Sequence, residues 1–344
     1  MRPERDGSGR YVVDGQDAGG GKAVSLYCNV VFKGGGIKGV AYAGALRALA
    51  RHGLLRGVRR VAGTSSGAMA AVFLALGASP DEMVDILLRT PFHKFMDASR
   101  WVGGDLQRLV RDFGWFKGEM LERWARANIA ALTGNPHMTF AEHQRMVEAD
   151  PGRYLELTII GANLSIQTPE LFNAERTPEV PIHEALRVSM SIPLFFKAVR
   201  NHRGELLVDG SVVWNYPISL YDKVRYVVPG AARNVHPENR DEDAVVLNRE
   251  TLGLMVETRS GSEGIVRESC QITDFRTYLR SIIGFMTDSM HSAYLSEADW
   301  KRTALIDALG IRSTDFHIGK DVVESLVASG DRCIEAFIAS GKHC

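Results

Sequence analysis

The sequence predicts an α/β protein with a mostly parallel central sheet. Short apolar runs rich in β-branched residues alternate with helix-like segments along most of the chain. Parallel strands require crossover connections, so this alternation predicts a sheet covered by helices on both faces. The chain has 344 residues, of which 45% are hydrophobic. A chain of this size can bury a core without disulfides or metals.

The first elements follow this pattern closely. The apolar run 28–33, "CNVVFK", precedes a glycine-rich turn and predicts a buried strand. Residues 40–52 predict a helix that ends before Gly53. Residues 58–63, "VRRVAG", predict a second strand, and residues 66–76 predict a buried helix.

The remaining elements continue the alternation. "SPDE" at 79–82 combines an N-cap serine, a proline at the first helical position and a glutamate three residues after the cap, which predicts a helix up to Thr90. The later expectations are a mostly helical stretch over 103–150 that includes a helix at 118–134, strands at 154–165, 204–210, 243–258 and 302–311, a helix at 182–190, and a largely helical stretch over 265–297.

No change of composition that would mark a linker follows residue 23. We therefore expect a single domain over 23–344, preceded by a polar, glycine-rich, flexible leader over 1–22. The leader lacks the apolar segment of a secretory signal. The longest apolar run, 67–78, is too short to span a bilayer. We expect a cytoplasmic protein that would meet a membrane only at its surface, with delivery elsewhere as an effector as the open alternative.

Charge and cysteine content exclude several classes of protein. The chain has 41 basic and 41 acidic residues, so the net charge does not favour nucleic-acid binding. The cysteines are dispersed and show no zinc-site spacing. No cluster has the spacing of calcium or zinc ligands, so we expect no metal or other cofactor. The oligomeric state is not indicated.

The stretch "VVFKGGGIKGVAYAG" (31–45) raises two alternatives. Gly34, Gly36 and Gly39 match the G-x-G-x-x-G pattern of dinucleotide sites between a strand and a helix. That reading requires an acidic residue about 20 positions later. The first acidic residue after Gly34 is Asp81. An NADP site could instead use an arginine, and the chain offers three candidates in this region, Arg56, Arg59 and Arg60.

The second alternative is an oxyanion hole for acyl transfer. "GTSSG" (63–67) is a G-x-S-x-G elbow at a predicted strand-to-helix turn, which would expose the Ser65 hydroxyl. Gly63 and Gly67 would allow the tight turn. The amides of the glycine loop 34–36 would then point at the oxyanion. The two segments follow neighbouring parallel strands, so we expect them to converge on one crevice.

The base that this serine would need is less obvious. None of the histidines follows an acidic residue in the order of an α/β-hydrolase triad; His52, His183 and His202, for example, lie at a helix end, a helix start and a polar turn. Asp209 in "LLVDGSVVWNYP" is the best candidate because it ends an apolar strand before Gly210. Taken alone, "DG" is also a common strand-ending turn.

Together, "GGGIKG", "GTSSG" and "DGS" resemble the motifs of the patatin-like phospholipase family. The resemblance implies a three-layer α/β/α fold with Ser65 as nucleophile and Asp209 as base, without a histidine. It also implies an oxyanion loop over 34–39, with amides around Gly35 and Gly36, Lys38 in the family's basic position and Gly39 closing the motif. The family usually has Gly or Ala where this chain has Ser211.

The implied activity is hydrolysis of fatty-acyl esters of phospholipids through an acyl-serine, with phospholipid and a membrane surface as partners. Burial should raise the pKa of Asp209 and make it a better base. An acyltransferase, a lipid-binding module without activity and an NADP-dependent oxidoreductase are the alternatives. The segment 91–124, within a helical cover predicted over 91–150, is either an amphipathic helix facing the core or a lid that faces the membrane.

Overall fold

The computed structural model describes residues 27–97, 102–227, 241–258, 271–273, 275–284 and 295–341. The leader predicted over 1–22 lies outside these residues, as does much of the helical stretch predicted over 265–297. None of the helices in the described ranges combines the length and apolar character needed to cross a membrane.

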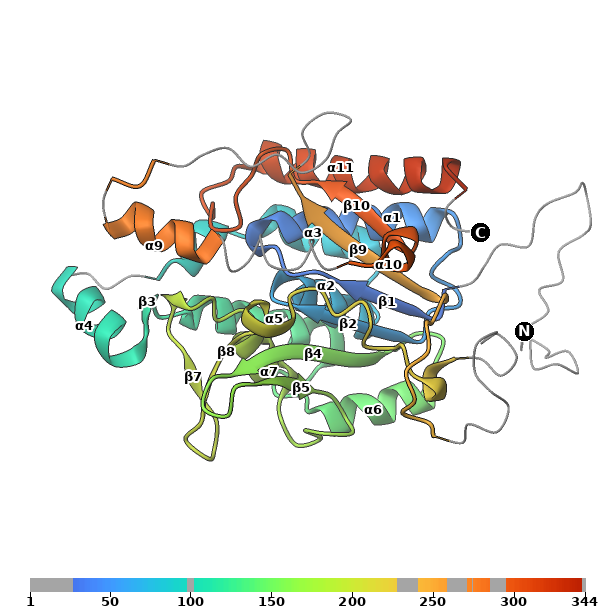
Figure 1. The fold of residues 1–344 in the computed structure, drawn as a ribbon, viewed down its shortest axis with the longest axis horizontal. Coiled ribbons are helices and arrows are strands. Elements are labelled where there is room, and N and C mark those ends of the chain that lie inside the picture. Colours follow the sequence, from blue (N-terminus) through green and yellow to red (C-terminus); the bar gives the residue numbers. More distant parts are fainter. Residues whose placement is uncertain are drawn as a thin grey trace, which may run out of the picture.

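A large mixed sheet forms the centre of the molecule (Figure 1), in the order β10-β9-β1-β2-β4-β8-β7, with β5 paired to β4. The pairs among β10, β9, β1, β2 and β4 are parallel, whereas β5, β8 and β7 join in antiparallel orientation. The mostly parallel sheet predicted from sequence is confirmed. The strands are β1 (Asn29–Phe32), β2 (Arg60–Thr64), β4 (Glu156–Asn163), β5 (Thr168–Phe172), β7 (Val199–Arg200), β8 (Leu206–Asp209), β9 (Thr251–Glu257) and β10 (Thr303–Asp307).

Helices connect and cover these strands, as the alternation predicted. Figure 1 shows α11 running beside α1, and the two helices contact each other. The helices are α1 (Ala41–Arg51), α2 (Ser66–Ala75), α3 (Pro80–Arg89), α4 (Val102–Asp112), α5 (Glu119–Thr133), α6 (Phe140–Ala149), α7 (Ile182–Ser189), α8 (Ser211–Trp214), α9 (Phe275–Gly284), α10 (Glu297–Lys301) and α11 (Lys320–Ala339), with 3-10 turns η1 (Gly36–Val40), η2 (Phe92–Phe95) and η3 (Val224–Tyr226).

Successive residues of β1 point to opposite faces of the sheet, and both faces are covered. Phe32 belongs to the main core, which includes side chains of α1, α2, α3, α7 and α11. Val31 belongs to a second, smaller core with Tyr216, Ile218 and Tyr221 from the segment after α8. A sheet covered on both faces has strands without polar alternation, which explains the continuous apolar run "VVF" of β1. The three-layer α/β/α arrangement is confirmed.

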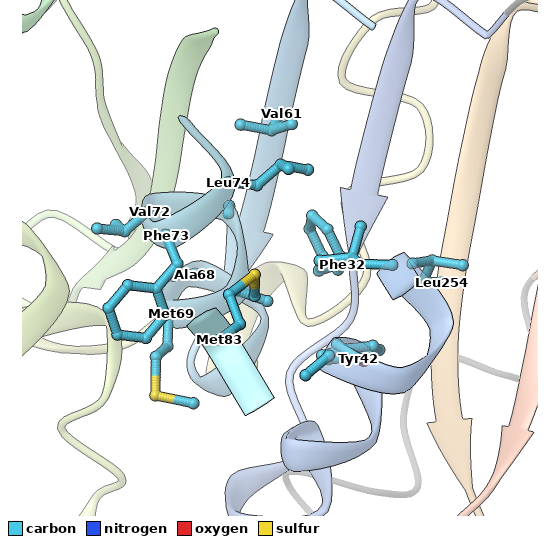
Figure 2. Packing of buried hydrophobic residues seen from close by; sticks show 14 of the residues in the cluster. Phe32, Tyr42, Val61, Ala68, Met69, Val72, Phe73, Leu74, Met83 and Leu254 are labelled. Carbon is cyan, nitrogen blue, oxygen red and sulfur yellow. The ribbon is translucent and has the colours of Figure 1, made fainter. Parts of the chain in front are cut away.

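Helix α2 lies within the main core, and all ten of its residues are buried. Figure 2 shows its side chains close to those of the neighbouring strand residues Phe32 and Val61. Phe32 also packs edge-on against Tyr42 of α1, with 5.3 Å between the ring centroids. The segment at the amino end of α2 is therefore held by rigid surroundings.

The predicted helical cover over 91–150 also contains a strand. Gly114–Phe116 forms β3, which pairs in parallel with β6 (Leu194–Phe196) in a separate two-stranded sheet. Helix α5 buries Leu121, Ala125 and Ile129, so its apolar side faces the core. The cover also exposes apolar side chains outside α5. Val110, near the end of the preceding helix α4, is 73% exposed.

Candidate active site

Ser65 stands at the bend between β2 and α2, as the elbow motif predicted, but the expectation that the turn exposes it is wrong, because Ser65 is only 4% exposed. Its backbone has φ 55° and ψ −126°, a conformation that non-glycine residues rarely adopt. A Cβ on Gly63 would lie 2.2 Å from the Gly67 carbonyl oxygen, and a Cβ on Gly67 would lie 2.5 Å from the Phe32 carbonyl oxygen. Both positions therefore require glycine, because the turn folds back onto itself and onto β1.

The glycine loop follows β1 and lies beside the elbow. A Cβ on Gly34 would be 3.2 Å from the Cβ of Ser65. Gly36 has φ +57°, and a Cβ there would lie 2.0 Å from the Ser313 carbonyl oxygen. A Cβ on Gly39 would lie 2.4 Å from the Ser66 Oγ. The predicted convergence of the two segments is confirmed.

The expectation that three loop amides point at the oxyanion needs correction. The Gly34 amide donates to the Asn215 carbonyl (3.0 Å), and the Gly35 amide donates to the Ser66 hydroxyl (3.1 Å). The Gly36 amide forms no hydrogen bond within the described part of the chain. The same holds for the Ser66 amide at the start of α2, which the sequence interpretation did not consider. Its signal was its place directly after the nucleophile.

Lys38 was predicted to contribute to the oxyanion site, but its ammonium group is directed elsewhere. Lys38 is 2% exposed, and its Nζ lies 3.7 Å from the Glu257 carboxylate at the end of β9. The same carboxylate contacts the Lys33 Nζ at 2.5 Å. The two lysines and the glutamate form a buried charged cluster beside the glycine loop.

Asp209 ends β8 at the same level of the sheet as Ser65. Thr64 is paired with Ile160 on β4, and the next residue, Gly161, is paired with Asp209 on β8. Ser65 and Asp209 therefore lie on either side of β4, next to the same pair of β4 residues. A Cβ on Gly210 would lie 2.5 Å from the Ile160 carbonyl oxygen, so the residue after Asp209 must be glycine.

The carboxyl group of Asp209 is fully buried. Burial is the largest cause of its raised pKa, which reaches about 7; the Ser211 amide and the nearby Ser65 and Ser211 hydroxyl groups partly oppose the rise. Oδ1 accepts a hydrogen bond from the Ser211 amide at 2.8 Å. Oδ2 has no hydrogen bond of standard geometry, and the Ser65 hydroxyl lies close enough to affect the pKa. A carboxylate in this state can accept a proton near neutral pH.

One short segment, "SMS" at 189–191, contacts both candidate residues. The Ser189 hydroxyl accepts from the Ser65 amide at 2.9 Å. The Ser191 carbonyl accepts from the Asp209 amide at 2.9 Å. Both serines are fully buried. Ser189 and Ser65 are 124 residues apart in the sequence. No local sequence signal therefore indicated that this segment holds the two candidate residues.

Histidines within the described residues make their contacts away from Ser65 and Asp209. His52 contacts Glu335, His143 contacts the Ala75 carbonyl, and His137 and His183 contact each other. The described residues contain no group of three or more His, Cys, Asp or Glu side chains placed to hold a metal ion.

The NADP alternative fails on geometry. Arg56, Arg59 and Arg60 precede or begin β2, whereas the glycine loop follows the carboxyl end of the parallel strand β1. The arginines therefore lie at the amino ends of the parallel strands, and the loop lies at their carboxyl ends. A dinucleotide site would need both groups at the carboxyl ends.

Comparison with known proteins identifies the family of this chain. A family model described as patatin-like phospholipase matches residues 30–221, a range that contains the glycine loop, Ser65 and Asp209. The chain belongs to the patatin-like phospholipase family. It is 24% identical to the uncharacterized protein YqhO of Bacillus subtilis over 326 residues, which cover 91% of this chain and 98% of YqhO.

Two further relatives extend the comparison. The chain is 25% identical over 194 residues to "Probable lipid hydrolase 463L" of Invertebrate iridescent virus 6, covering 56% of this chain and 63% of that protein. The crystal structure of VipD from Legionella pneumophila has a TM-score of 0.55 at 15% identity, covering 98% of this chain and 70% of VipD. The VipD likeness concerns the fold. Family membership supports lipid acyl hydrolase activity.

Proposed function

We propose that this chain hydrolyses fatty-acyl esters of phospholipids with Ser65 as nucleophile and Asp209 as the base. The observation that carries the proposal is the pairing of a hydroxyl at a strained turn with a fully buried carboxyl whose pKa is raised to about 7. An ordinary aspartate would be too weak a base at neutral pH. A raised pKa near the working pH is the tuning that general-base catalysis needs.

The reaction has two steps. Asp209 accepts the Ser65 proton as the hydroxyl attacks the ester carbonyl, and the protonated aspartic acid then returns the proton to the leaving lysophospholipid oxygen. An acyl-serine remains. Asp209 next accepts a proton from a water molecule as that water attacks the acyl-serine. Asp209 then returns the proton to the leaving Ser65 oxygen, which releases the fatty acid and restores the free serine.

The charge that develops on the substrate oxygen needs donors. We propose the Gly36 amide and the Ser66 amide for this role, because neither donates to another described group. Ser66 begins α2, so its amide also carries the positive end of the helix dipole. Such donors each contribute about 2.7–4 kcal/mol of transition-state stabilisation in comparable sites.

The direct test measures fatty acid released from a fluorescent phospholipid by the wild-type protein, Ser65→Ala and Asp209→Asn. The account predicts turnover by the wild type and a loss in both variants of at least about 10³-fold, as for removal of a nucleophile or its base. Free fatty acid distinguishes hydrolysis from transfer to an alcohol. Turnover by Ser65→Ala at the wild-type rate would refute the proposal.

The substrate resides in membranes, and we propose that the end of α4 contacts their surface. Val110 and Phe113 are 73% and 42% exposed, and the exposed Arg111 lies between them. Exposed apolar side chains beside a basic group suit the interface of an anionic bilayer. Vesicle sedimentation with Val110→Ser/Phe113→Ser should show weaker binding than the wild type. Equal binding would exclude this surface.

A further inference from the structure

A pocket of about 620 Å³ lies apart from the residues of the proposed reaction. Helices α5 and α7 and the segments around β3, β6 and β7 contribute to it, at the edge of the sheet where β7 and β8 pair (Figure 1). Ser65, Asp209 and the glycine loop are not among its lining residues. Its charged lining includes Arg111, Lys117, Glu122, Glu184, Arg187 and Arg200.

Arg187 is the most unusual of these residues because it is only 7% exposed. Its Nη2 donates to the carbonyl oxygens of Lys117 (2.7 Å) and Lys197 (3.0 Å), and its Nη1 donates to the Ser191 hydroxyl. All three acceptors are neutral. Within the described residues, no carboxylate lies within 4.0 Å of the guanidinium group, and its Nε–H makes no hydrogen bond.

Glu122, Asp97 and Glu119 act on the Arg187 charge without forming an ion pair with it. A buried cation without a direct ion pair is costly, because more distant carboxylates offset its desolvation only in part. Burial accordingly lowers the pKa of Arg187 from its ordinary value. Natural proteins usually pair such a charge or use it to bind a ligand. Arg187 lines a cavity large enough for a small ligand.

The acidic residues of the pocket offset this charge only in part. The Asp112 carboxylate pairs with Lys197 at 3.5 Å. The Glu119 carboxylate pairs with Arg123 at 3.6 Å. The lining then holds two remaining carboxylates, Glu122 and Glu184, and four remaining basic side chains, so positive charge is in excess. The four are Arg111, Lys117, Arg187 and Arg200.

We propose that this pocket binds a phosphate group, carried either by a soluble phosphate monoester or by the head group of a phospholipid. The Arg187 guanidinium group would supply positive charge, and its Nε–H, which makes no hydrogen bond within the described residues, would donate to a phosphate oxygen. Lys117 at the pocket wall would add a second positive charge.

Two hydrogen bonds would also connect the site to the proposed base. The Arg187 guanidinium bonds the Ser191 hydroxyl, and the Ser191 carbonyl holds the Asp209 amide. The inference itself concerns binding alone and does not depend on whether the protein hydrolyses lipids.

Calorimetric titration of the full chain with inorganic phosphate and with glycerol 3-phosphate tests the proposal, with chloride at the same ionic strength as the control. Lys117→Ala removes the rim charge but keeps the carbonyl that Arg187 uses. It should weaken binding about tenfold, as expected for a lost charged hydrogen bond. Arg89→Ala, which removes an exposed charge outside the pocket (82% side-chain exposure), should leave binding unchanged.

A second arm identifies the source of the phosphate. Sedimentation with vesicles of phosphatidylcholine, with and without phosphatidic acid, is compared for the same variants. Binding of phosphatidic-acid vesicles that Lys117→Ala weakens and Arg89→Ala does not would indicate a lipid head group. Binding of the soluble phosphates alone would indicate a soluble ligand. Absence of saturable binding in both arms, or binding that Lys117→Ala leaves unchanged, would overturn the proposal.

Discussion

The Ser189 hydroxyl accepts a hydrogen bond from the Ser65 amide at 2.9 Å and donates one to the Ile160 carbonyl at 2.5 Å. Ser65 is the N-cap residue of α2, and its backbone is strained. The amide of a residue at this position has no partner within the helix. Ser189 supplies that partner and connects the turn to β4, so it fixes the orientation of Ser65.

Ser189→Ala should lower kcat while KM changes little, because the loosened turn misplaces the nucleophile without altering substrate binding. We expect a decrease of about tenfold or more, in line with the loss of a buried hydrogen bond at a positioned group. Steady-state kinetics on a soluble acyl ester measures it.

Ser329→Ala is the matched control. Ser329 is also a buried helical serine, and its hydroxyl donates to the Asp307 carbonyl of β10 at 2.7 Å, with no contact to Ser65 or Asp209. Its kcat should equal the wild-type value. A similar fall in both variants would mean that Ser189 acts only through stability.

Ser211→Ala should shift the acidic limb of the pH–rate profile to higher pH. The Ser211 hydroxyl lowers the pKa of Asp209, so its removal raises that pKa further. The Ser211 amide still donates to Oδ1, which preserves the geometry. A profile of kcat/KM against pH for both proteins measures the shift. A limb that moves to lower pH would contradict the assignment of this titration to Asp209.

Asp209→Asn should stabilise the folded protein, and more so at pH 8 than at pH 4. The pKa of Asp209 rises from 3.8 to about 7 on folding, so the native state binds more protons between these values. Stability is therefore lost as pH rises through this window. The pKa difference sets an upper bound on the order of 4 kcal/mol. Urea unfolding at both pH values measures the gain; an equal gain at both would argue against a raised pKa.

Gly36→Ala should abolish most activity. Its φ of +57° disfavours a side chain, and the new Cβ would lie 2.0 Å from the Ser313 carbonyl oxygen. The displaced amide would no longer face the oxyanion, which costs roughly 10²–10³-fold in kcat. Gly134→Ala is the control, because it has φ +78° but no heavy atom within 4 Å of the added Cβ. Its kcat should remain normal even if its melting temperature falls.

Local motifs predicted much of this site. The glycine loop, the elbow at Ser65 and the aspartate before Gly210 lie in short segments whose turn chemistry is encoded nearby. The parallel strands β1 and β2 followed from their apolar runs and the helix between them. Features of this kind depend on neighbours in sequence, so they can be predicted from one chain.

Other features depend on contacts between distant segments. The sequence interpretation did not reveal that Gly34 and Gly35 use their amides internally, that Lys38 pairs with Glu257, or that Ser189 holds Ser65. The partners in these contacts lie at least 31 residues apart in the sequence. The antiparallel pairing of β8 with β4 could not be predicted either, because an apolar run is compatible with both strand directions.

The pH dependence of Ser65 labelling by a fluorophosphonate tests the central claim most directly. The account predicts that mass spectrometry locates the adduct on Ser65. The labelling rate should rise with pH through an inflection near 7, which is set by the pKa of Asp209. Asp209→Asn should abolish this inflection together with most of the labelling. Rapid labelling of Ser65 in Asp209→Asn with the wild-type pH profile would contradict it.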